Sequence, residues 1–357
     1  MKPDYLIVGS GLTGATLARL LTDAGRDVVV LDRRGHGGGN VHDHVHVLSQ
    51  ITVHTYGPHY FRTNSDRIWS FVNRFSSFYN YEACIQSKIY NDYYHWPVWK
   101  SEFDKFSKGQ RASFDGEPKN LEEAALKLMP RRIYELFVKE YNEKQWGVQT
   151  TALDRELCSR FDVREENEPR LKPDAKYQGL PTSGYTGFMQ KMLTGIKLEL
   201  GVDFLRHRDK FAAKHLIFTG PIDEYFDFKL GRLAYRGQRR DHKYHQTNTF
   251  ILPVGQVNYP RHADGKLIRA IEWKHMSKPN AVVNGTVITT ETPFSPVLPD
   301  EYEYPFPDLQ NKSLYGKYRE LADEQKDLTI AGRLGEYKYF DMDQAIGRAI
   351  KIAETIL

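Results

Sequence analysis

Two glycine clusters near the start of the chain carry its clearest chemical signal. The spacing G-x-G-x-x-G follows an apolar segment at residues 5–8 and comprises Gly9, Gly11 and Gly14. This spacing allows a tight turn, a close approach of the backbone to a pyrophosphate, and a closely packed helix whose free N–H groups attract phosphate. Asp32 ends the next apolar segment, where a carboxylate can hold ribose hydroxyls. The pattern predicts dinucleotide binding.

The second cluster, residues 33–40, follows Asp32 directly and reads Arg-Arg-Gly-His-Gly-Gly-Gly-Asn. A simple NAD dehydrogenase does not need such a segment, whereas flavoproteins of the glutathione-reductase type often have one. The two clusters together therefore indicate FAD as the cofactor. The cofactor contacts expected here are Gly9, Gly11, Thr13, Gly14, Asp32, Arg33, Gly38, Gly39 and Asn40.

Composition excludes several classes of protein. The 357 residues carry a net charge of only +4, with 50 basic and 46 acidic residues, which argues against a nucleic-acid partner. Cys84 and Cys158 are the only cysteines, so no disulfide framework is expected. No apolar run reaches the roughly 18 residues of a membrane-spanning helix, and the first residues do not resemble a signal peptide. We expect a cytoplasmic protein without a membrane partner.

The hydrophobic pattern predicts an opening βαβ unit at residues 4–31 and a hairpin at 45–56, followed by a mostly helical segment at 64–150. Residues 160–181 are polar and rich in proline, which indicates a mobile loop, and alternation over 233–288 predicts an antiparallel sheet. Helices are expected at 64–78, 120–128, 131–141, 184–193, 314–322 and 342–356. Strands are expected at 197–200, 216–218 and 328–332.

The motifs resemble those of the UDP-galactopyranose mutase family over essentially the full length. Tyr141–Trp146 resembles the family's Y-T-x-K-Q-W. Residues 332–342 read G-R-L-G-E-Y-K-Y-F-D-M. The order of the three motifs along the chain, K-Q-W, then Y-Q-G, then this segment, is the most specific match to the family. The other matching segments are 34–40, with the family's R-x-H-I-G-G-N, 56–64, with its Y-G-P/A-H-x-F-H-T-N, and 177–181 and 219–223.

This resemblance implies an α/β fold: an FAD-binding Rossmann-like domain of the glutathione-reductase type, a helical domain and an antiparallel β-sheet domain. The cofactor domain is expected at 1–60, 182–220 and 316–357. The helical substrate domain is expected at 61–153, and the mobile loop with the sheet domain at 154–181 and 221–315.

The resemblance also implies a reaction without net redox change. Reduced flavin N5 attacks the anomeric carbon of UDP-galactopyranose and UDP leaves. A flavin iminium forms as the ring opens, and reclosure gives the furanose used in cell-surface polysaccharides. An external reductant such as NAD(P)H keeps FAD reduced. The expected partner is a nucleotide-diphosphate sugar, and the family's dimers make a homodimer one expected assembly.

Site residues follow from matching positions. Arg164 and Arg269 match arginines that contact the diphosphate, while His59 and Arg62 lie beside flavin and sugar; these four are the expected catalytic residues. The expected substrate-binding residues are Phe137, Tyr141, Asn142, Trp146, Arg160, Tyr177, Tyr304 and Tyr339. The remaining cofactor contacts are His59, Arg333, Tyr339, Asp341 and Met342. Asp341 also suits the N-cap of the helix that begins at Met342.

The chain departs from the family pattern where sugar and base are recognised. Arg62 replaces a histidine, and a longer cationic donor there suits an extra acceptor such as a 2-acetamido carbonyl. Residues 96–100 and 165–170 also differ, so dTDP-fucose is an alternative substrate, and a flavin amine oxidase-like oxidoreductase is an alternative enzyme class. Six histidines between His36 and His59 suggest zinc, but a solvated or flavin-edge strand explains them better, and no metal site is expected.

Overall fold

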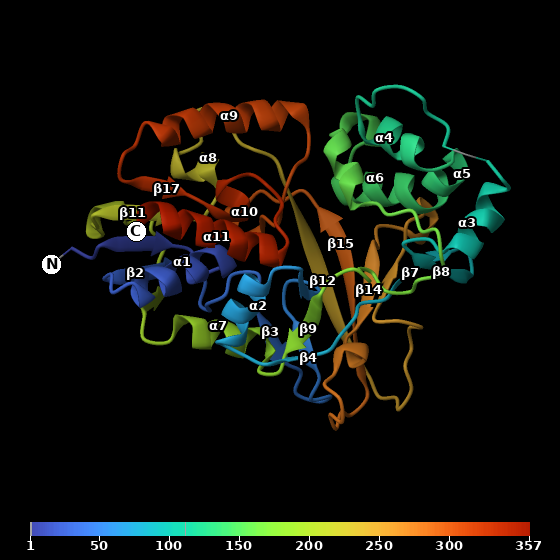
Figure 1. Ribbon diagram of the computed structural model, residues 1–357, viewed down its shortest axis with the longest axis horizontal. Helices are drawn as coiled ribbons and strands as arrows, with labels where there is room; N and C mark the ends of the chain where they lie inside the picture. Colours follow the sequence, from blue (N-terminus) through green and yellow to red (C-terminus); the bar gives the residue numbers. More distant parts are fainter. Residues whose placement is uncertain (1, 111) are drawn as a thin grey trace.

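The computed structural model describes residues 2–110 and 112–357, and its cofactor-side layer is a parallel five-stranded sheet (Figure 1). All four strand pairings are parallel, as the expected βαβ start requires. The sheet order is β10 (Lys197–Leu200), β2 (Val28–Asp32), β1 (Tyr5–Val8), β11 (His215–Phe218) and β17 (Leu328–Ile330).

Helices cover both faces of this sheet. On one face α1 (Leu12–Asp23) packs against α11 (Met342–Ile356) and α7 (Gly184–Leu193), over the inward side chains Ile7, Val30 and Ile217. On the other face α8 (Ile222–Tyr225) and α9 (Leu309–Asp323) enclose a second core that includes Phe218. The alternate side chains of the central strands β1, β2 and β11 thus enter different cores, which is why β1 and β2 are almost continuously apolar, whereas the edge strand β10 carries Lys197 and Glu199.

A seven-stranded sheet forms the centre of the molecule. It is antiparallel except for the parallel pair β13–β7. Its order is β16 (Tyr304–Pro305), β12 (Tyr235–His245), β15 (Thr286–Phe294), β14 (Arg269–Glu272), β13 (Gln256–Asn258), β7 (Ile85–Ile89) and β8 (Asp92–Trp96). Two small sheets join it to the parallel sheet: β3 (Asp43–Val45) with β4 (Thr52–His54), and β5 (Phe61–Thr63) with β9 (Tyr177–Pro181) and β6 (Phe78–Tyr79).

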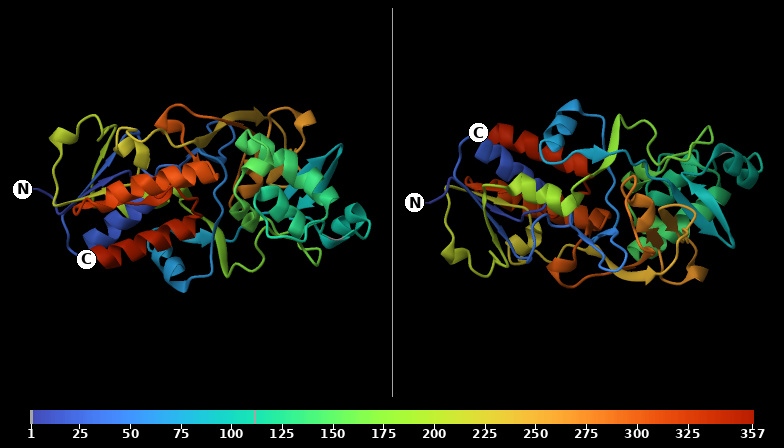
Figure 2. Two further views of the ribbon diagram at one scale, coloured as in Figure 1. Left: turned by 90° about the horizontal axis from the view of Figure 1, so that it is seen from above. Right: turned by 90° about the horizontal axis from the view of Figure 1, so that it is seen from below.

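A helical unit lies at the opposite end of the molecule from both termini (Figure 2). Its core contains Tyr134 and Phe137, which lie on a π-helical turn at residues 134–139. The elements are α3 (Lys100–Ser107), α4 (Leu121–Leu128), α5 (Arg131–Ile133) and α6 (Glu140–Trp146). The short helices α2 (Asp66–Asn73) and α10 (Gly332–Gly335) lie outside this unit. No helix among residues 2–110 and 112–357 has the length and apolar character to cross a bilayer.

The prediction of a mostly helical segment at 64–150 is wrong between residues 78 and 96. Three strands lie there, and β7 and β8 extend the seven-stranded sheet. Ile85, Ser87 and Ile89 are buried while the residues between them are not, so this part has the two-residue period of a strand. The helices at 184–193 and 342–356 are confirmed, and the hairpin predicted at 45–56 lies at residues 43–54.

Candidate active site

The two glycine clusters meet in space. Gly11 and Gly38 form a parallel bridge. A Cβ atom on Gly39 would lie 2.8 Å from Cα of Gly11, and one on Gly14 would lie 1.9 Å from the carbonyl oxygen of Gly9. Side chains at either place would push the backbones apart. The two clusters therefore form one structural feature, here called the glycine junction (Gly9, Gly11, Gly14, Gly38 and Gly39). It leaves the backbone at the first turn of α1 free of side chains.

A cavity of about 210 Å³ opens over this junction. α1 begins after Gly11 without a side-chain cap, so its first N–H groups are available to an anionic ligand. The geometry fits a dinucleotide: glycine backbone, a free helix N-terminus and a strand-end carboxylate converge on one space. Of the predicted cofactor residues, those that line the cavity are Gly9, Gly11, Thr13, Gly14, Asp32, Arg33, Gly39, Asn40, His59, Arg333 and Met342.

The Asp32 carboxylate is hydrogen-bonded to the turns that follow β1 and β2. It accepts bonds from the backbone N–H and the hydroxyl of Ser10, at 2.8 and 2.6 Å, and from the backbone N–H of Arg34 at 2.9 Å. Arg33 in turn donates to both oxygens of Glu224, at 3.0 and 2.8 Å. Asp32 thus fixes the turn at the end of β2, and a ribose contact would be a second role for it.

A larger cleft of about 1370 Å³ adjoins the cavity, and Phe340 lines both. Two cations face one aromatic ring there: Cζ of Arg160 lies 3.9 Å, and Cζ of Arg333 4.7 Å, from the ring centroid of Tyr339. Tyr304 stacks on Tyr339 with centroids 6.1 Å apart. Positive charge held on aromatic faces beside hydroxyl groups suits a phosphate-bearing ligand.

Arg62 and Asp341 form an ion pair in the wall of this cleft, with Nη2 of Arg62 3.1 Å from the carboxylate. Asp341 is also the N-cap residue of α11, and its backbone N–H donates to the Gln344 side chain at 3.0 Å. The predicted capping position is confirmed. The Asp341 carboxylate therefore links the N-terminus of α11 to Arg62, the side chain that replaces the family's histidine.

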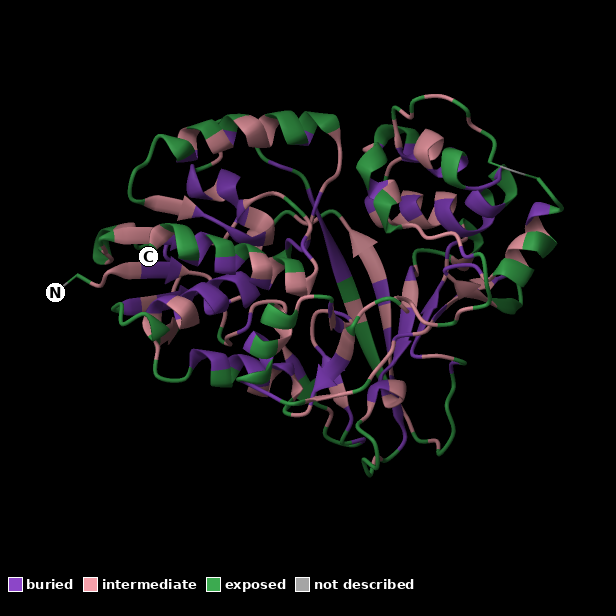
Figure 3. Cartoon of the chain, in the orientation of Figure 1, coloured by how far each residue is buried: buried purple, intermediate pink, exposed green. Residues whose placement is uncertain are grey.

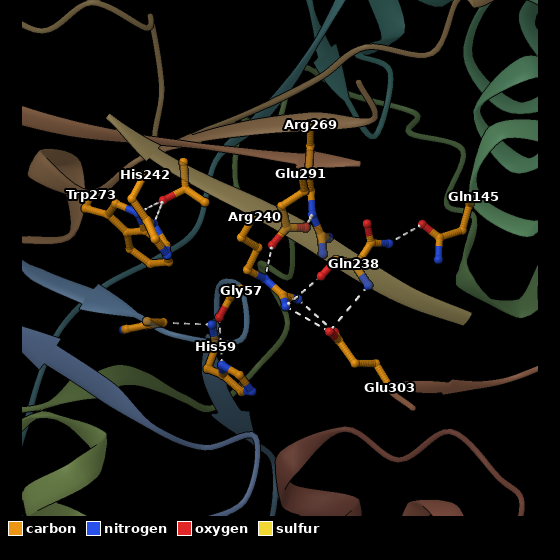
Figure 4. A network of polar contacts seen from close by, with 12 residues as sticks. Gly57, His59, Gln145, Gln238, Arg240, His242, Arg269, Trp273, Glu291 and Glu303 are labelled. Carbon is orange, nitrogen blue, oxygen red and sulfur yellow. Dashed lines mark hydrogen bonds and ion pairs between the residues drawn. The ribbon is translucent and has the colours of Figure 1, made fainter. Parts of the chain in front are cut away.

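A network of alternating charges links side chains of β12, β14 and β15 with Glu303 (Figure 4). Arg269 on β14 pairs with one oxygen of Glu291 on β15. The other oxygen accepts from Nε of Arg240 on β12 at 2.9 Å. Arg240 also donates to both oxygens of Glu303, at 2.8 and 2.7 Å, and Glu303 lines the cofactor cavity. The network thus joins the arginine expected at the substrate to the cofactor cavity.

The charges in this network fix one another. Burial alone would raise the pKa of Glu291, but Arg269 and Arg240 hold that pKa below its ordinary value. The side chain of Glu291 is fully buried, and that of Arg269 is 18% exposed. Burial raises the pKa of Tyr141, which lies near this pair. Glu291 therefore orients Arg269 while leaving part of its guanidinium accessible.

His59 lies in the turn that follows Gly57, beside the cofactor cavity (Figure 4). Its Nδ1 lies 2.8 Å from the carbonyl oxygen of Gly57, and its backbone N–H donates to Nδ1 of His54 at 3.0 Å. Burial, with His54 and Arg333 nearby, lowers the pKa of His59 to about 3. Because a carbonyl can only accept, Nδ1 carries the proton and Nε2 of the neutral ring is an acceptor.

Some predicted residues do not reach the cleft. Arg164 is buried in its own loop, where Nη2 donates to the carbonyl oxygens of Arg170 and Leu171, both at 3.1 Å. The local pairing explains this position, because the loop carbonyls accept from Nη2 and the Asp162 carboxylate forms an ion pair with Nε at 2.9 Å. A phosphate contact by Arg164 requires the loop to rearrange, and this role stays a prediction.

Four further predicted substrate residues, and the predicted catalytic Arg269, lie outside both cavity linings. One of the four is Tyr141, which lies near the pair of Arg269 and Glu291. Phe137 packs in the core of the helical unit and stacks on Trp96 at 6.0 Å. Asn142 is buried and donates to the carbonyl oxygen of Val138 at 2.8 Å. Tyr177 stacks on Trp69 and donates to Asp66 at 2.6 Å. Of the predicted cofactor residues, Gly38 lies behind the cavity, and Tyr339 and Asp341 face the cleft.

Glu291, Arg240 and Glu303 were not among the predicted residues. The sequence could have indicated them only through the charged residues that interrupt the strands β12 and β15 at inward-facing positions. Buried charges are rare unless they are paired or functional. For the histidines, among residues 2–110 and 112–357 no group of three or more His, Cys, Asp or Glu side chains is arranged to hold a metal ion.

Comparison with known proteins gives the family. A sequence model described as UDP-galactopyranose mutase matches residues 136–339. The chain belongs to the UDP-galactopyranose mutase family. A model described as an NAD(P)-binding Rossmann-like domain matches residues 7–75. The family, the α/β fold class and the mutase class predicted from the sequence are thereby confirmed, and members of this family depend on a flavin.

Two relatives cover almost the whole chain. A protein of Klebsiella pneumoniae described as a probable UDP-galactopyranose mutase is 30% identical, over 99% of this chain and 94% of its own length. An Escherichia coli dTDP-fucopyranose mutase is 32% identical, over 99% of this chain and 98% of its own. The crystal structure of a reduced UDP-galactopyranose mutase has the same fold, with a TM-score of 0.77, 14% identity and coverage of 99% and 95%. The family thus includes enzymes named for different sugars.

Proposed function

We propose that this protein is an FAD-dependent mutase that interconverts UDP-galactopyranose, or UDP-N-acetylgalactopyranosamine, with the furanose form. The adjoining cavities are the observation that carries this proposal. Tyr339 and Asp341 line the cleft, Met342 lines the cofactor cavity, and Phe340 lines both. A cofactor ring and a sugar can therefore meet at residues 339–342 without either leaving its own space.

FAD fits the cofactor cavity because the free N-terminus of α1 and the glycine junction suit its pyrophosphate. The residues proposed to hold FAD are those of the glycine clusters together with His59, Arg333 and Met342. When bound and kept reduced by a donor such as NAD(P)H, FAD supplies N5 as the nucleophile. The protein positions the nucleotide sugar and stabilises the negative charge of the leaving diphosphate.

The leaving diphosphate needs positive charge close to its oxygens. The guanidinium groups of Arg160 and Arg333 both contact the ring of Tyr339. The hydroxyl groups of Tyr339 and of Tyr304, which stacks on it, are further hydrogen-bond donors in the cleft. Guanidinium groups match phosphate oxygens through paired N–H bonds. Arg269, fixed by Glu291, is proposed to act on the same diphosphate, and Arg164 to join it from the loop.

Neutral His59 lines the cofactor cavity, and Nε2 is the ring nitrogen left free to accept a hydrogen bond. Negative charge on a reduced flavin would favour protonation of this nitrogen, which would then donate a hydrogen bond. His59 is therefore proposed to respond to the charge of the cofactor without acting as a permanent cation.

The N-acetyl form of the substrate is proposed from Arg62. Its Nη2 is paired with Asp341, while its other N–H groups have room to bind an acceptor in the cleft. A 2-acetamido carbonyl is such an acceptor. The relative named dTDP-fucopyranose mutase makes dTDP-fucose the second candidate substrate for the same chemistry.

A panel of nucleotide sugars tests the proposal. The dithionite-reduced protein is incubated anaerobically with UDP-galactose, UDP-N-acetylgalactosamine and dTDP-fucose, and chromatography measures furanose formation. We expect Arg62→His to reduce turnover of the N-acetyl sugar relative to UDP-galactose by about tenfold. Arg67→His, at an exposed site on α2, is the matched control. An unchanged preference in Arg62→His would refute the acetamido contact. In a separate assay in air, oxygen consumption with substrate and no furanose product would favour an amine oxidase-like reaction.

A further inference from the structure

Three loops at one end of the seven-stranded sheet share an unusual composition. They are residues 44–51, 243–255 and 273–285, here called the tip surface. None of these residues is Asp or Glu, although the chain has 46 acidic residues in 357. The loops contain Lys274, Lys278 and, at the end of β12, Lys243, which pairs with Asp241 just outside the tip surface at 3.3 Å. The tip surface thus differs in charge from the nearly balanced chain as a whole.

Contacts between the loops make the tip surface continuous. The backbone N–H of Asn284 donates to the carbonyl oxygen of Ser49 at 2.9 Å. His46 stacks on Tyr244 with ring centroids 5.6 Å apart. Nζ of Lys274 donates to the carbonyl oxygen of Asn248 at 2.9 Å. The three loops extend together toward the lower edge of Figure 1.

Large apolar side chains point outward at the ends of these loops. Val282 is 94% exposed, Val47 81%, Leu48 60% and Phe250 53%. Exposed turns dominate this end of the molecule (Figure 3). Single exposed apolar residues are common, but several on adjacent loops within an acid-free surface indicate an interaction site.

We propose that the tip surface docks on a membrane that contains anionic lipids. Apolar side chains on projecting loops can enter the boundary between headgroups and acyl chains, while the lysines remain beside the lipid phosphates. No carboxylate lies within the three segments to repel an anionic surface, and the neighbouring Asp241 is paired with Lys243. Two copies of this surface would bring lysines against lysines, which disfavours a second copy as its occupant.

Docking by these loops leaves the chemistry accessible. No residue of the tip surface lines the cofactor cavity or the cleft. The sequence analysis expected no membrane partner because the chain has no long apolar run. That criterion finds helices that span a membrane and does not find loops that bind to its surface. Apolar residues divided among three loops produce no such run. The proposal concerns the membrane surface and adds no spanning segment.

Co-sedimentation with vesicles tests this proposal on the full-length, flavin-loaded protein. One set of vesicles is pure phosphatidylcholine, and the other contains phosphatidylglycerol as well. We expect binding to the anionic vesicles, little binding to the neutral ones, and weaker binding at high salt because salt screens the lysines. The variant Val47→Glu/Leu48→Glu/Val282→Glu should lose at least about tenfold in vesicle partitioning.

Leu309→Glu is the matched control, since Leu309 is 70% exposed but lies on α9, outside the tip surface. Far-ultraviolet circular dichroism and retained flavin absorbance verify that each variant is folded. Wild-type protein that stays in the supernatant with anionic vesicles would overturn the proposal. Equal partitioning of the triple variant and the wild type would overturn it as well. So would a triple variant that changes only the oligomeric state, because the surface would then bind another copy.

Discussion

Arg240 and Glu291 lie on neighbouring strands, and their side chains meet inside the molecule, with Nε of Arg240 2.9 Å from the Glu291 carboxylate. Each is also bound to a second partner: Arg240 to the buried Glu303, and Glu291 to Arg269, which is 18% exposed. The pair therefore couples the wall of the cofactor cavity to an arginine expected at the diphosphate. A buried pair of this kind is weak evidence for stability by itself, so its retention points to positioning.

Removing one charge from the pair should be costly. Glu291→Gln leaves Arg240 and Arg269 buried with one carboxylate fewer, and we expect the free energy of unfolding to fall by about 3–5 kcal/mol. Urea unfolding measures this loss. Asp241→Asn on the same strand is the control, because Asp241 is exposed and should change stability by less than about 1 kcal/mol. A Glu291→Gln protein as stable as the wild type would contradict the account of the network.

The glycine junction predicts a selective effect on the cofactor. Gly14→Ala places a Cβ atom 1.9 Å from the carbonyl oxygen of Gly9, which must displace the first turn of α1. We expect flavin affinity to fall by more than about tenfold, as measured by the flavin absorbance retained on purification. Gly35→Ala is the control, since a Cβ there meets no atom within 4 Å. Equal flavin retention in both variants would show that the junction does not set the pyrophosphate site.

A buried histidine predicts acid sensitivity. Burial, with His44 nearby, lowers the pKa of His54 to about 3, below the 6.5 of the unfolded chain. The contribution of neutral His54 is therefore present above pH 6.5 and is lost as the pH falls from 6.5 toward 3. His54→Asn keeps an acceptor for the His59 N–H and should flatten the loss of stability between pH 6.5 and 4 by about 1.4 kcal/mol per pH unit.

Urea unfolding at several pH values measures this difference. His262→Asn, at a side chain that is 55% exposed, should retain the wild-type slope. A His54→Asn protein with the same pH dependence as the wild type would show that His54 titrates normally in the folded state.

The stack of Arg160 on Tyr339 predicts a binding effect. Arg160→Ala removes a cation 3.9 Å from the ring centroid in the cleft wall, and we expect KM for the nucleotide sugar to rise about tenfold with kcat changed less than about threefold. Arg160 ends a 3-10 helix that runs from Arg155 to Arg160. Arg155→Ala, at the other end of this helix, is the control, because Arg155 pairs with Glu117 at the surface. A fall in kcat alone would place Arg160 in the chemical step instead of in binding.

Local patterns predicted the opening βαβ unit and the glycine turn before α1, because those residues act through nearby backbone. The contact between the two glycine clusters was not predicted, because Gly11 and Gly38 meet only in the folded chain. The helix at 342–356 was predicted with its correct ends, since Asp341 caps it and its apolar face is regular. The charge network was not predicted, because Arg240, Arg269, Glu291 and Glu303 meet only after β12, β14, β15 and β16 pair. The positions of Arg164 and Phe137 could not be predicted either, since they depend on which loop carbonyls and core rings surround them.

The most direct test of the central claim compares the oxidised and the reduced protein. Each is incubated anaerobically with UDP-galactose and UDP-N-acetylgalactosamine, and furanose product is measured by chromatography. The account predicts furanose with at least one of the two sugars from the reduced protein, and at least about a hundredfold less from the oxidised protein. Furanose formed at equal rates in both states, or by protein stripped of flavin, would contradict it.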